Sequence, residues 1–373
     1  MHKKTIVFML IISLLLTGCW DKIEIEERAH VSAVGVDKYT ADFENEDEGD
    51  SYVFTFSFPE HKAETSEDII VSSVGKTLYS VSRIIADRSN KEFFPGHLRT
   101  IVIEADIAKD PKAFRQILDG IENDRFLSRR VVLALTEGSA AEVIRVVPAM
   151  ENKIGEFISE LFRRTDRISR IVGGSAGDIF NDLYESGNTI IPKIMPGESD
   201  VKVAGAGIIK DHKFIGWLGE VETALLVILK GETKCLCGMS IEHKGHNIPV
   251  SLAPKKPKLK LIEDEENIKI LMEVEMEGDI RQTYFEASED MLKTGVVSKI
   301  EDAIIEMINQ KAQDTVDKIQ NEFQTDVLDI NKYLRRFHYK LWNEVEEDWQ
   351  EIFPNIDIEV SIDIKIRRIG LVR

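Results

Sequence analysis

Apolar residues recur along the first half of the chain with two periods, one typical of strands and one typical of helices. Short runs rich in Val, Tyr and Phe predict strands, because β-branched and aromatic side chains fit a pleated, half-buried surface. Apolar positions at steps of three and four residues predict amphipathic helices, and proline suits the first turn of a helix. Strands are predicted over residues 31–37, 52–58, 97–103 and 131–135, and helices over 72–87, from Pro111 and from Ser139.

The second half repeats this mixture and ends in longer elements. Asp211-His212-Lys213 separates two predicted strands, 201–210 and 214–218, and so predicts a hairpin. Further patterns predict a strand over 268–276, a long helix over 297–323, a second helix over 334–349 and a strand over 356–366. Together they predict a mixed α/β (α+β), multi-domain fold of mixed sheets flanked by helices, which ends in a long helix pair and a C-terminal strand.

The first residues have the pattern of a bacterial export signal. Lys3 and Lys4 precede a mostly apolar run that is shorter than the ~20 residues of a bilayer-spanning helix. The run ends in Leu16-Thr17-Gly18-Cys19, which is the cleavage pattern of a lipoprotein. We therefore expect residues 1–18 to be removed and the Cys19 thiol to carry a diacylglyceryl group, whose two chains anchor stably. The alternative is an ordinary signal peptide with a chance cysteine.

The charge of the chain limits the partners that it can attract. Its formal net charge is −18 at pH 7, and an acidic surface repels nucleic acid and anionic lipid headgroups. Membrane attachment is therefore expected to come from the lipid on Cys19 and from protein partners. Turn signals near Pro196 divide the chain into a signal peptide (1–18), an N-terminal α/β region of one or more domains (19–198) and a C-terminal α/β domain (199–373).

One short segment gathers the residue types that bind metal ions, namely Cys235, Cys237, His243 and His246. Four such ligands can hold zinc, but Cys-x-Cys and His-x-x-His differ from the usual spacings. A disulfide between Cys235 and Cys237 suits an exported protein, although so tight a ring would be strained. Two half-buried thiols are the interpretation that we favour, so we expect neither a metal nor a cofactor.

The remaining candidate motifs argue against an enzyme. The glycine-rich segment 173–177 lacks the Lys-Ser/Thr of a phosphate-binding loop, and Gly205-Ala206-Gly207 lacks the third glycine of a dinucleotide loop. Glu104 and Asp106 form a carboxylate pair at the end of a predicted strand, and such pairs are usually solvated. Trp342 and Trp349 share one helical face, which indicates a core position. No catalytic residue is therefore expected.

Four blocks in order along the chain resemble the Ger(x)C-type spore germination lipoproteins. The first, CWDKIEIEERAHVSAVGVD (19–37), has the Cys-Trp-Asp start, the Glu-Ile and the Val-x-x-x-Gly-Val-Asp strand of that family. The others are GHLRTIVIEADIAKD (96–110), GAGIIKDHKFIGWLGEVE (205–222) and RRFHYKLWNEVEEDWQEIFPNIDIEVSIDIKIRRIGLV (335–372). One departure is His338-Tyr339, which stands where a proline-containing turn is common, so we expect the second long helix to run on unbroken.

The resemblance implies three mixed α/β domains and the role of C subunit in a nutrient germinant receptor. It further implies a non-enzymatic protein beside two integral membrane subunits, held by the lipid on Cys19 at the outer face of the inner spore membrane. It names no germinant and does not say whether this subunit contacts one. A second hypothesis is a solute-binding lipoprotein of an ABC importer, which would have two similar lobes with parallel sheets around a ligand cleft.

Overall fold

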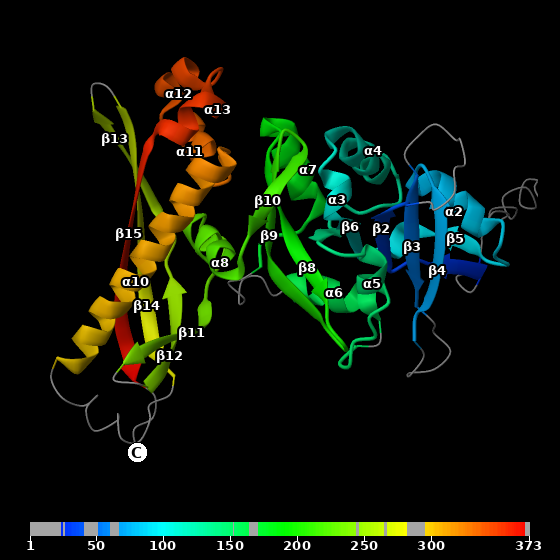
Figure 1. Cartoon of the computed structure of the whole chain (residues 1–373), viewed down its shortest axis with the longest axis horizontal. Coiled ribbons are helices and arrows are strands. Elements are labelled where there is room, and N and C mark those ends of the chain that lie inside the picture. Colours follow the sequence, from blue (N-terminus) through cyan, green and yellow to red (C-terminus); the bar gives the residue numbers. More distant parts are fainter. Residues whose placement is uncertain are drawn as a thin grey trace, which may run out of the picture.

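The chain forms an elongated molecule with a different sheet in each half (Figure 1). The computed structural model describes residues 24, 27–40, 51–59, 67–151, 153–163, 171–243, 246–264, 267–281 and 295–369. An eight-stranded sheet and its helices form the N-terminal part, and a five-stranded sheet with a long helix forms the opposite end. A short parallel pair, β1 (Arg28–His30) and β5 (Glu92–Phe94), makes a third sheet. The mixed α/β fold class predicted from the sequence is confirmed.

The eight-stranded sheet is mixed, with parallel strands at its centre and antiparallel strands at both edges. β7, β6 and β2 run parallel to one another, whereas β3 and β4 on one side and β9 and β10 on the other pair antiparallel. In spatial order the strands are β10 (Lys213–Leu218), β9 (Val201–Lys210), β8 (Thr189–Pro196), β7 (Val132–Thr136), β6 (Thr100–Glu104), β2 (Ala33–Lys38), β3 (Tyr52–Phe58) and β4 (Ile69–Gly75).

Helices cover both faces of this sheet, because its central strands are apolar on both sides. One core cluster joins even-numbered residues of β2 and β3, such as Val34 and Phe54, to one set of helices. The second joins Ala33 and Val102 to the other set. The first face holds α2 (Leu78–Ala86), α3 (Ala105–Ala108), α4 (Pro111–Glu122) and α7 (Ala176–Ser186), and the second holds α5 (Ala140–Ile144) and α6 (Ile154–Phe162).

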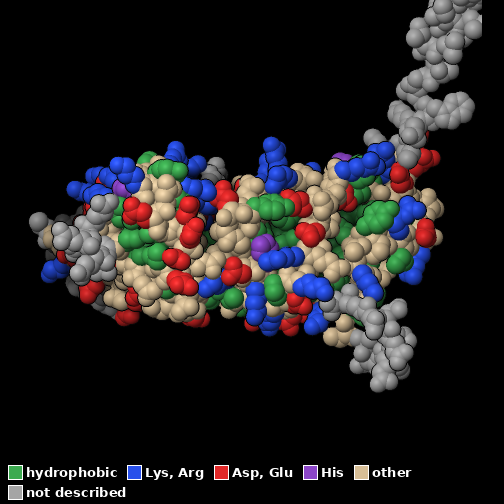
Figure 2. Space-filling model, turned by 90° about the horizontal axis from the view of Figure 1, so that it is seen from above, with side chains coloured by type: hydrophobic (Ala, Val, Ile, Leu, Met, Phe, Trp, Pro, Cys, Tyr) green, Lys and Arg blue, Asp and Glu red, His purple; other side chains and the backbone are tan. Residues whose placement is uncertain are grey.

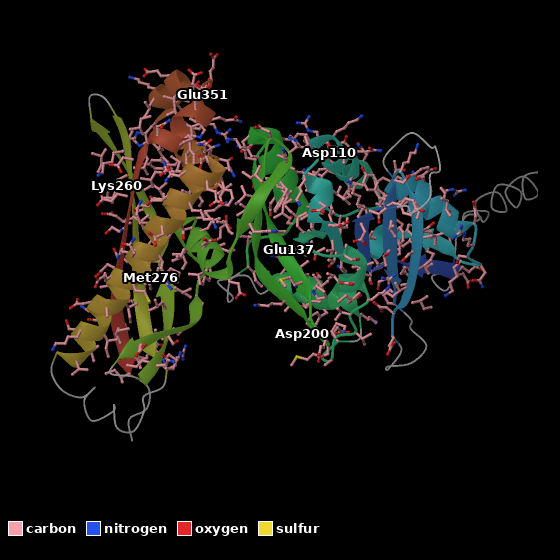
Figure 3. The ribbon with its side chains drawn as sticks, viewed as in Figure 1. Asp110, Glu137, Asp200, Lys260, Met276 and Glu351 are labelled. Carbon is pink, nitrogen blue, oxygen red and sulfur yellow. The ribbon has the colours of Figure 1, made fainter. Side chains whose placement is uncertain are left out.

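Local capping sets the helix starts in this half. The Asp110 carboxylate accepts from the Lys112 N–H at 2.9 Å, and Pro111 follows as the first helical residue of α4, as expected for an N-cap (Figure 3). The helix predicted over 72–87 begins later, at Leu78, because Thr77 and Ser80 form a capping box. The residues before it, Ile69–Gly75, pair with β3 as strand β4. That part of the prediction was wrong.

The strand predicted over 97–103 also begins later than expected. Pro95–His97 form a single 3₁₀ turn, and strand β6 starts only at Thr100. The other expected elements of this half lie where the patterns placed them. Strands β2, β3 and β7 and helices α4 and α5 cover their predicted segments within one or two residues.

The C-terminal sheet is built around one long strand, β14 (Asn267–Ile280). β12 (His246–Pro254) and β13 (Lys258–Asp264) pair antiparallel with successive parts of β14, and β11 (Leu236–His243) pairs with β12. β15 (Asp357–Ile369) pairs parallel with β14 along most of its length. Alternate residues of β15 are buried, so the expected period-two strand is confirmed.

Helix α10 (Val296–Lys318) packs on the buried face of this sheet and continues into a π-helical turn, Ile319–Phe323. The second long helix, predicted to be unbroken, is divided into three. The chain leaves helical geometry at His338, with φ −132° and ψ 51°. Each piece buries its own apolar residue, Leu334, Val345 or Trp349, so the apolar spacing persists without a continuous helix. The pieces are α11 (Ile330–Phe337), α12 (Tyr339–Val345) and α13 (Trp349–Ile352), with a 3₁₀ turn at Phe353–Asn355.

The two halves are connected by a hairpin and by a hydrophobic core that cross the boundary predicted at residues 198–199. The hairpin β9–β10, confirmed around Asp211, extends the N-terminal sheet through hydrogen bonding of β9 to β8. Helix α8 (Glu220–Leu229) follows, and its residues Thr223 to Leu229 are all buried. They join Ile190 and Ile208 to the core that contains α10 and β14. A continuous hydrophobic core therefore connects the halves, and the domain boundaries inferred from the sequence stay a prediction.

Candidate functional site

The predicted lipidation residue, Cys19, lies outside the described residues, so its role stays a prediction. Among the residues that the structure describes, no helix is both long and apolar enough to cross a membrane. The described residues also contain no group of three His, Cys, Asp or Glu side chains arranged to hold a metal ion.

In the candidate zinc or disulfide segment, the structure describes the side chain of Cys235. It is half-buried and disulfide-bonded, and its sulfur lies 3.9 Å from the Ser251 hydroxyl. The interpretation of two free thiols is therefore wrong for Cys235. The side chains of Cys237, His243 and His246 lie outside the described set, so the structure does not place the complete constellation.

The carboxylate pair and the glycine-rich segment have structural contacts. Glu104 accepts from the Lys38 N–H at 2.7 Å, whereas Asp106 pairs with Lys109. Residues 173–177 also fit the Gly-x-Ser-x-Gly pattern of serine hydrolases. However, the Ser175 backbone is ordinary, with φ −64° and ψ 124°, and its hydroxyl donates to the Arg129 carbonyl at 3.0 Å. A nucleophile elbow needs a strained turn and an adjacent base. The ordinary backbone of Ser175 therefore does not fit a nucleophile elbow.

A cleft of ≈ 960 Å³ lies between the two halves. One wall is the polar face of α7, and the other is formed by the end of α8 and the start of α11. Nearly all of its polar lining is charged. The charged residues are Asp178, Asp182, Glu185, Lys230, Glu232, Asp329, Lys332, Arg335 and Arg336.

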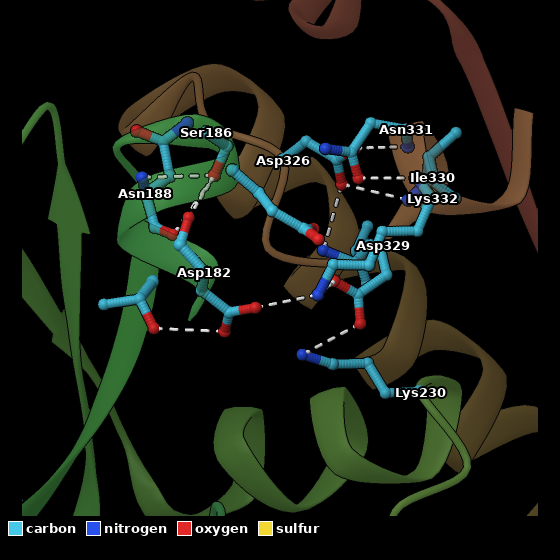
Figure 4. A network of polar contacts seen from close by, with 12 residues as sticks. Asp182, Ser186, Asn188, Lys230, Asp326, Asp329, Ile330, Asn331 and Lys332 are labelled. Carbon is cyan, nitrogen blue, oxygen red and sulfur yellow. Dashed lines mark hydrogen bonds and ion pairs between the residues drawn. The ribbon is translucent and has the colours of Figure 1, made fainter. Parts of the chain in front are cut away.

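A network of alternating charges crosses the cleft (Figure 4). Lys332 donates to Asp182 on α7 at 2.8 Å and to Asp329 at 3.0 Å. Asp329 also pairs with Lys230, at the end of α8, at 3.1 Å. The Asp182 carboxylate accepts in turn from the Thr189 hydroxyl of β8 at 3.2 Å. The network therefore links α7 and β8 of the N-terminal half to α8 and α11.

The loop that carries this network is shaped by Asp326. Its carboxylate accepts from the N–H groups of Leu328, Ile330 and Asn331 at 3.1, 3.2 and 2.7 Å. It also accepts from the Trp349 indole N–H at 3.2 Å, which ties the loop to α13. These bonds hold Asp329 in the left-handed region, with φ 63°, a conformation that Asp tolerates better than most residues.

The environment keeps the network ionised. Burial alone would lower the pKa of Lys230, whose side chain is 7 % exposed, but Glu232, Asp329 and Asp182 outweigh it and raise the pKa. Burial favours a raised pKa for Asp329, but Lys230 and Lys332 hold it below its usual value. Asp326 differs, because burial raises its pKa to about 6. Charges that neutralise one another in this way suit a rigid connection between elements better than proton transfer.

Sequence patterns could not find this network. Asp182 and Lys332 are 150 positions apart, and no motif links them. The one local signal is Asp326-x-x-Asp329 before a helix, which resembles an ordinary capping pattern. Of the residues singled out from the sequence, Gly173 lines the cleft, and Trp349 reaches it indirectly through Asp326.

Each half of the chain matches a known protein family. Residues 21–196 match the family described as spore germination protein N-terminal domain, and residues 204–370 match spore germination B3/GerAC like, C-terminal. Two relatives from Bacillus subtilis (strain 168) are similar over nearly their whole length. Spore germination protein YndF is 23% identical over 401 residues, covering 100% of this chain and 98% of the relative. Spore germination protein B3 is 24% identical over 386 residues, covering 99% and 98%.

A solved structure has the same fold. The crystal structure of the GerBC protein superposes with a TM-score of 0.60 and 19% sequence identity, covering 89% of this chain and 97% of that one. The two family matches together account for nearly all of the chain after Cys19, in the order expected from the four sequence blocks. The chain therefore belongs to the Ger(x)C-type family of spore germination proteins.

Proposed function

We propose that this chain is the lipid-anchored, non-enzymatic C subunit of a nutrient germinant receptor, acting beside two integral membrane subunits. Membership of the family places the chain in spore germination. The observation that carries the finer proposal is the position of Cys19. The family match begins at residue 21, two residues after the cysteine of the predicted lipoprotein signal, so the whole folded part would follow a lipid anchor at the outer face of the inner spore membrane.

A non-enzymatic role is supported by the chemistry of the cleft. Its central lysines and carboxylates neutralise one another, and Asp329 accepts from two lysines at once. A general base needs a free lone pair within reach of a substrate proton. The Ser175 hydroxyl, the nearest candidate nucleophile by sequence pattern, donates to a backbone carbonyl. The cleft is therefore best suited to holding α7, α8 and α11 in one arrangement.

The importer hypothesis has less support. Solute-binding lipoproteins have two similar lobes with parallel sheets, whereas the halves of this chain have an eight-stranded mixed sheet and a five-stranded sheet of different topology. A cleft between halves is common to both hypotheses, but here ion pairs between the walls cross it. Flanking genes for two multi-span membrane proteins would favour the receptor, and genes for a permease and an ATPase would favour the importer.

The anchor is tested by a Cys19→Ala variant in sporulating cells. We expect this variant to lack lipid and to keep its signal peptide, because the thiol is the site of lipid transfer. A chain that starts at Trp20, made without the signal, should stay in the aqueous phase without detergent. Phase partitioning and mass spectrometry of both proteins measure this. A Trp20 chain that needs detergent would contradict the proposal that Cys19 alone anchors the protein.

A further inference from the structure

Strand β4 forms an open edge of the eight-stranded sheet. It is the last strand in the spatial order of that sheet, and it pairs with β3 over all seven of its residues without a bulge. Within the part of the chain that the structure describes, the other side of β4 makes no backbone hydrogen bond. Apart from β3, only Arg145 bonds to this strand, through the Ser72 hydroxyl at 3.3 Å. A row of backbone N–H and C=O groups is therefore available for pairing.

The sequence of β4 lacks the features that usually prevent such pairing. The strand reads Ile-Ile-Val-Ser-Ser-Val-Gly, with no charged residue and no proline. Ile69 is 52 % exposed and Val74 is 40 % exposed. Seen from above, this end of the molecule also exposes hydrophobic side chains between charged ones (Figure 2). Uncharged segments of six or seven residues with high β-propensity are those that pair with other strands.

The other long edge strands that the structure describes are protected. β10 and β11 each contain a bulge. β13 carries the exposed side chains of Lys258 and Lys260. The outer edge of β15 is bonded by side chains of α10, one of which is Glu301, bound to the Ile366 N–H at 2.7 Å. Bulges, lysines and covering groups are the usual protections of a sheet edge, and β4 has none of them.

We propose that β4 pairs antiparallel with β4 of a second copy of this chain, with Ser72 at the centre. Ser72 is the middle residue of the strand, so this register pairs its whole length. A two-fold axis perpendicular to the sheet through this centre places Ile70 of each copy opposite Val74 of the other. Ile69 lies opposite Gly75 in the same way. The interface would contain apolar cross-strand pairs and no charged residue within the paired strands, which favours pairing.

The geometry of the anchor supports a second copy as the occupant. Arg28, the first residue of β1, follows Cys19 by nine positions, and Ala29 packs on the core cluster of the α2 face. A two-fold axis perpendicular to a sheet does not exchange its faces. Both chains would therefore reach their lipids from the same face of the joined sheet, at the end of the long axis where β4 lies (Figure 1). One membrane could hold both copies. This argument rests on the lipid anchor proposed above.

The anchor also compensates for the small size of the interface. A pair of seven-residue strands buries less surface than the roughly 1,200–2,000 Å² of a stable interface, so we expect weak pairing of the chain in solution. Attachment to one membrane raises the effective concentration of the two copies. The pairing should therefore be strongest in the anchored protein.

Arg145 gives the pairing a specific dependence on salt. Its bond to Ser72 lies on the α5 face, so pairing brings the two guanidinium groups toward the two-fold axis. Asp37 is near enough to each Arg145 to interact with it electrostatically, but the two like charges still oppose pairing. Added salt and Arg145→Gln should therefore each strengthen pairing, by up to about fivefold. The Arg145→Gln protein should also lose most of the salt dependence.

Cross-linking of the anchored protein tests the register. Directly opposite residues of antiparallel strands have Cα atoms about 4.5–5.5 Å apart, which is within the range of a disulfide. Membranes that hold the full chain with Ser72→Cys are oxidised in air with copper phenanthroline, and we expect a covalent dimer. Ser361→Cys is the matched control, because Ser361 is an exposed serine on β15 of the other sheet. The unsubstituted chain, oxidised in parallel, controls for the native cysteines.

Sedimentation equilibrium of the chain from Trp20 onward measures pairing without the lipid. Val74→Lys should weaken dimerisation about tenfold, because two Ile70–Val74 contacts are lost and each edge gains a lysine. Ile262→Lys is the matched control, because Ile262 is 43 % exposed on the edge strand β13. This control should associate as the unsubstituted chain does.

Three outcomes would overturn the inference. The first is an anchored Ser72→Cys protein that gives no more dimer than Ser361→Cys. The second is dimerisation that Val74→Lys and Ile262→Lys weaken equally. The third is cross-linking of Ser72→Cys to a different polypeptide in place of a second copy, which would assign the edge to a strand of a partner protein. Because sedimentation uses a chain without lipid, failure of Cys19 lipidation would leave that comparison unchanged, so the two proposals fail separately.

Discussion

The Gln313 side chain of α10 bonds to the free edge of β15 at Val360. Its Oε1 accepts from the Val360 N–H at 3.1 Å, and its Nε2 donates to the Ile358 carbonyl at 2.9 Å. One turn earlier on the same helix, Asn309 binds both backbone groups of Ile362 at 2.7 and 2.8 Å. These amides take the place of a neighbouring strand, and an uncovered edge would be open to pairing with another chain.

Replacing the edge amides should destabilise the protein and promote association. Gln313→Leu or Asn309→Leu leaves part-buried backbone groups of β15 without these partners, which costs up to about 1–3 kcal/mol per group, the penalty of a fully buried one. Urea unfolding measures the loss, and light scattering measures association through the uncovered edge. Gln310→Leu is the matched control, because Gln310 is on α10 and bonds only the exposed Asp314. A Gln313→Leu protein as stable as this control would contradict the assignment.

The buried carboxylate of Asp326 should make stability depend on pH. Burial raises its pKa to about 6 from an ordinary 3.8, against the opposing N–H bonds of Asn331 and Ile330. The folded state therefore binds this proton more tightly than the unfolded chain does. The free energy of unfolding should fall as pH rises from about 4 to about 6, by roughly 3 kcal/mol, and then level off.

The Asp326 contribution is isolated by comparison with a residue that does not titrate. The free energy of unfolding of the wild type minus that of Asp326→Asn should decline over this pH window. Asp314→Asn, which changes an exposed carboxylate on α10 in the same way, is the matched substitution for comparison. A flat difference for Asp326 would mean that its four N–H donors keep its pKa near the ordinary value.

The strand alternation and the long helix could be predicted from the sequence because each depends on local spacing. β15 and α10 each bury a regular series of side chains. The break at His338 could not be predicted, because it depends on contact with Tyr333 and on the separate burial of Val345 and Trp349. Short-range patterns record which face is apolar, and they do not record where tertiary packing interrupts a helix.

The sequence did not predict the start of α2 or the charged network, for two different reasons. Val74 is in helical phase with Leu78, so a strand residue was counted in the helix. Only pairing with β3 decides its structure, and pairing is not local. The network joins Asp182 to Lys332 across the fold, and a single sequence carries no signal for such a distant pair.

Removing Lys230 should be far more damaging than removing an exposed lysine. Lys230→Met removes a buried cation that Asp329 and Glu232 share, although these two side chains are 34 % and 40 % exposed. Breaking a fully buried pair costs about 3–5 kcal/mol, which is therefore the upper bound here. Lys109→Met, which removes an exposed partner of Asp106, should cost well under that amount. Combining Lys230→Met with Asp329→Asn should recover part of the loss in urea unfolding. Strict additivity of the two changes would show that the two residues do not act together.

The disulfide of Cys235 should be detectable and dispensable. Cys235 is disulfide-bonded, and the sequence offers Cys237 as its partner if Cys19 carries lipid. The chain from Trp20 onward should show no free thiol before reduction and two after it. Closing so short a loop stabilises by only ~1–2 kcal/mol in the chain-entropy account, so a double Ser variant should keep its fold. One zinc per chain by elemental analysis would exclude the disulfide in solution.

The length of the segment between Cys19 and the first domain should matter for germination. Even fully extended, residues 19–31 span ~40 Å at most, so a lipid on Cys19 would hold the N-terminal domain near the bilayer. A short tether raises the effective concentration of weakly binding partners, and this concentration falls as a linker lengthens. A Gly/Ser insertion of about 40 residues after Asp21 should therefore weaken the germinant response while fold and membrane attachment persist. Spores with matched protein levels, assayed by loss of optical density after germinant addition, provide the measurement.

The control for the tether is replacement of residues 22–26 by Gly/Ser at unchanged length. A rigid insertion is unsuitable as a control, because it would itself displace the domain. An unchanged response to the long insertion would mean that partner contacts alone position this subunit.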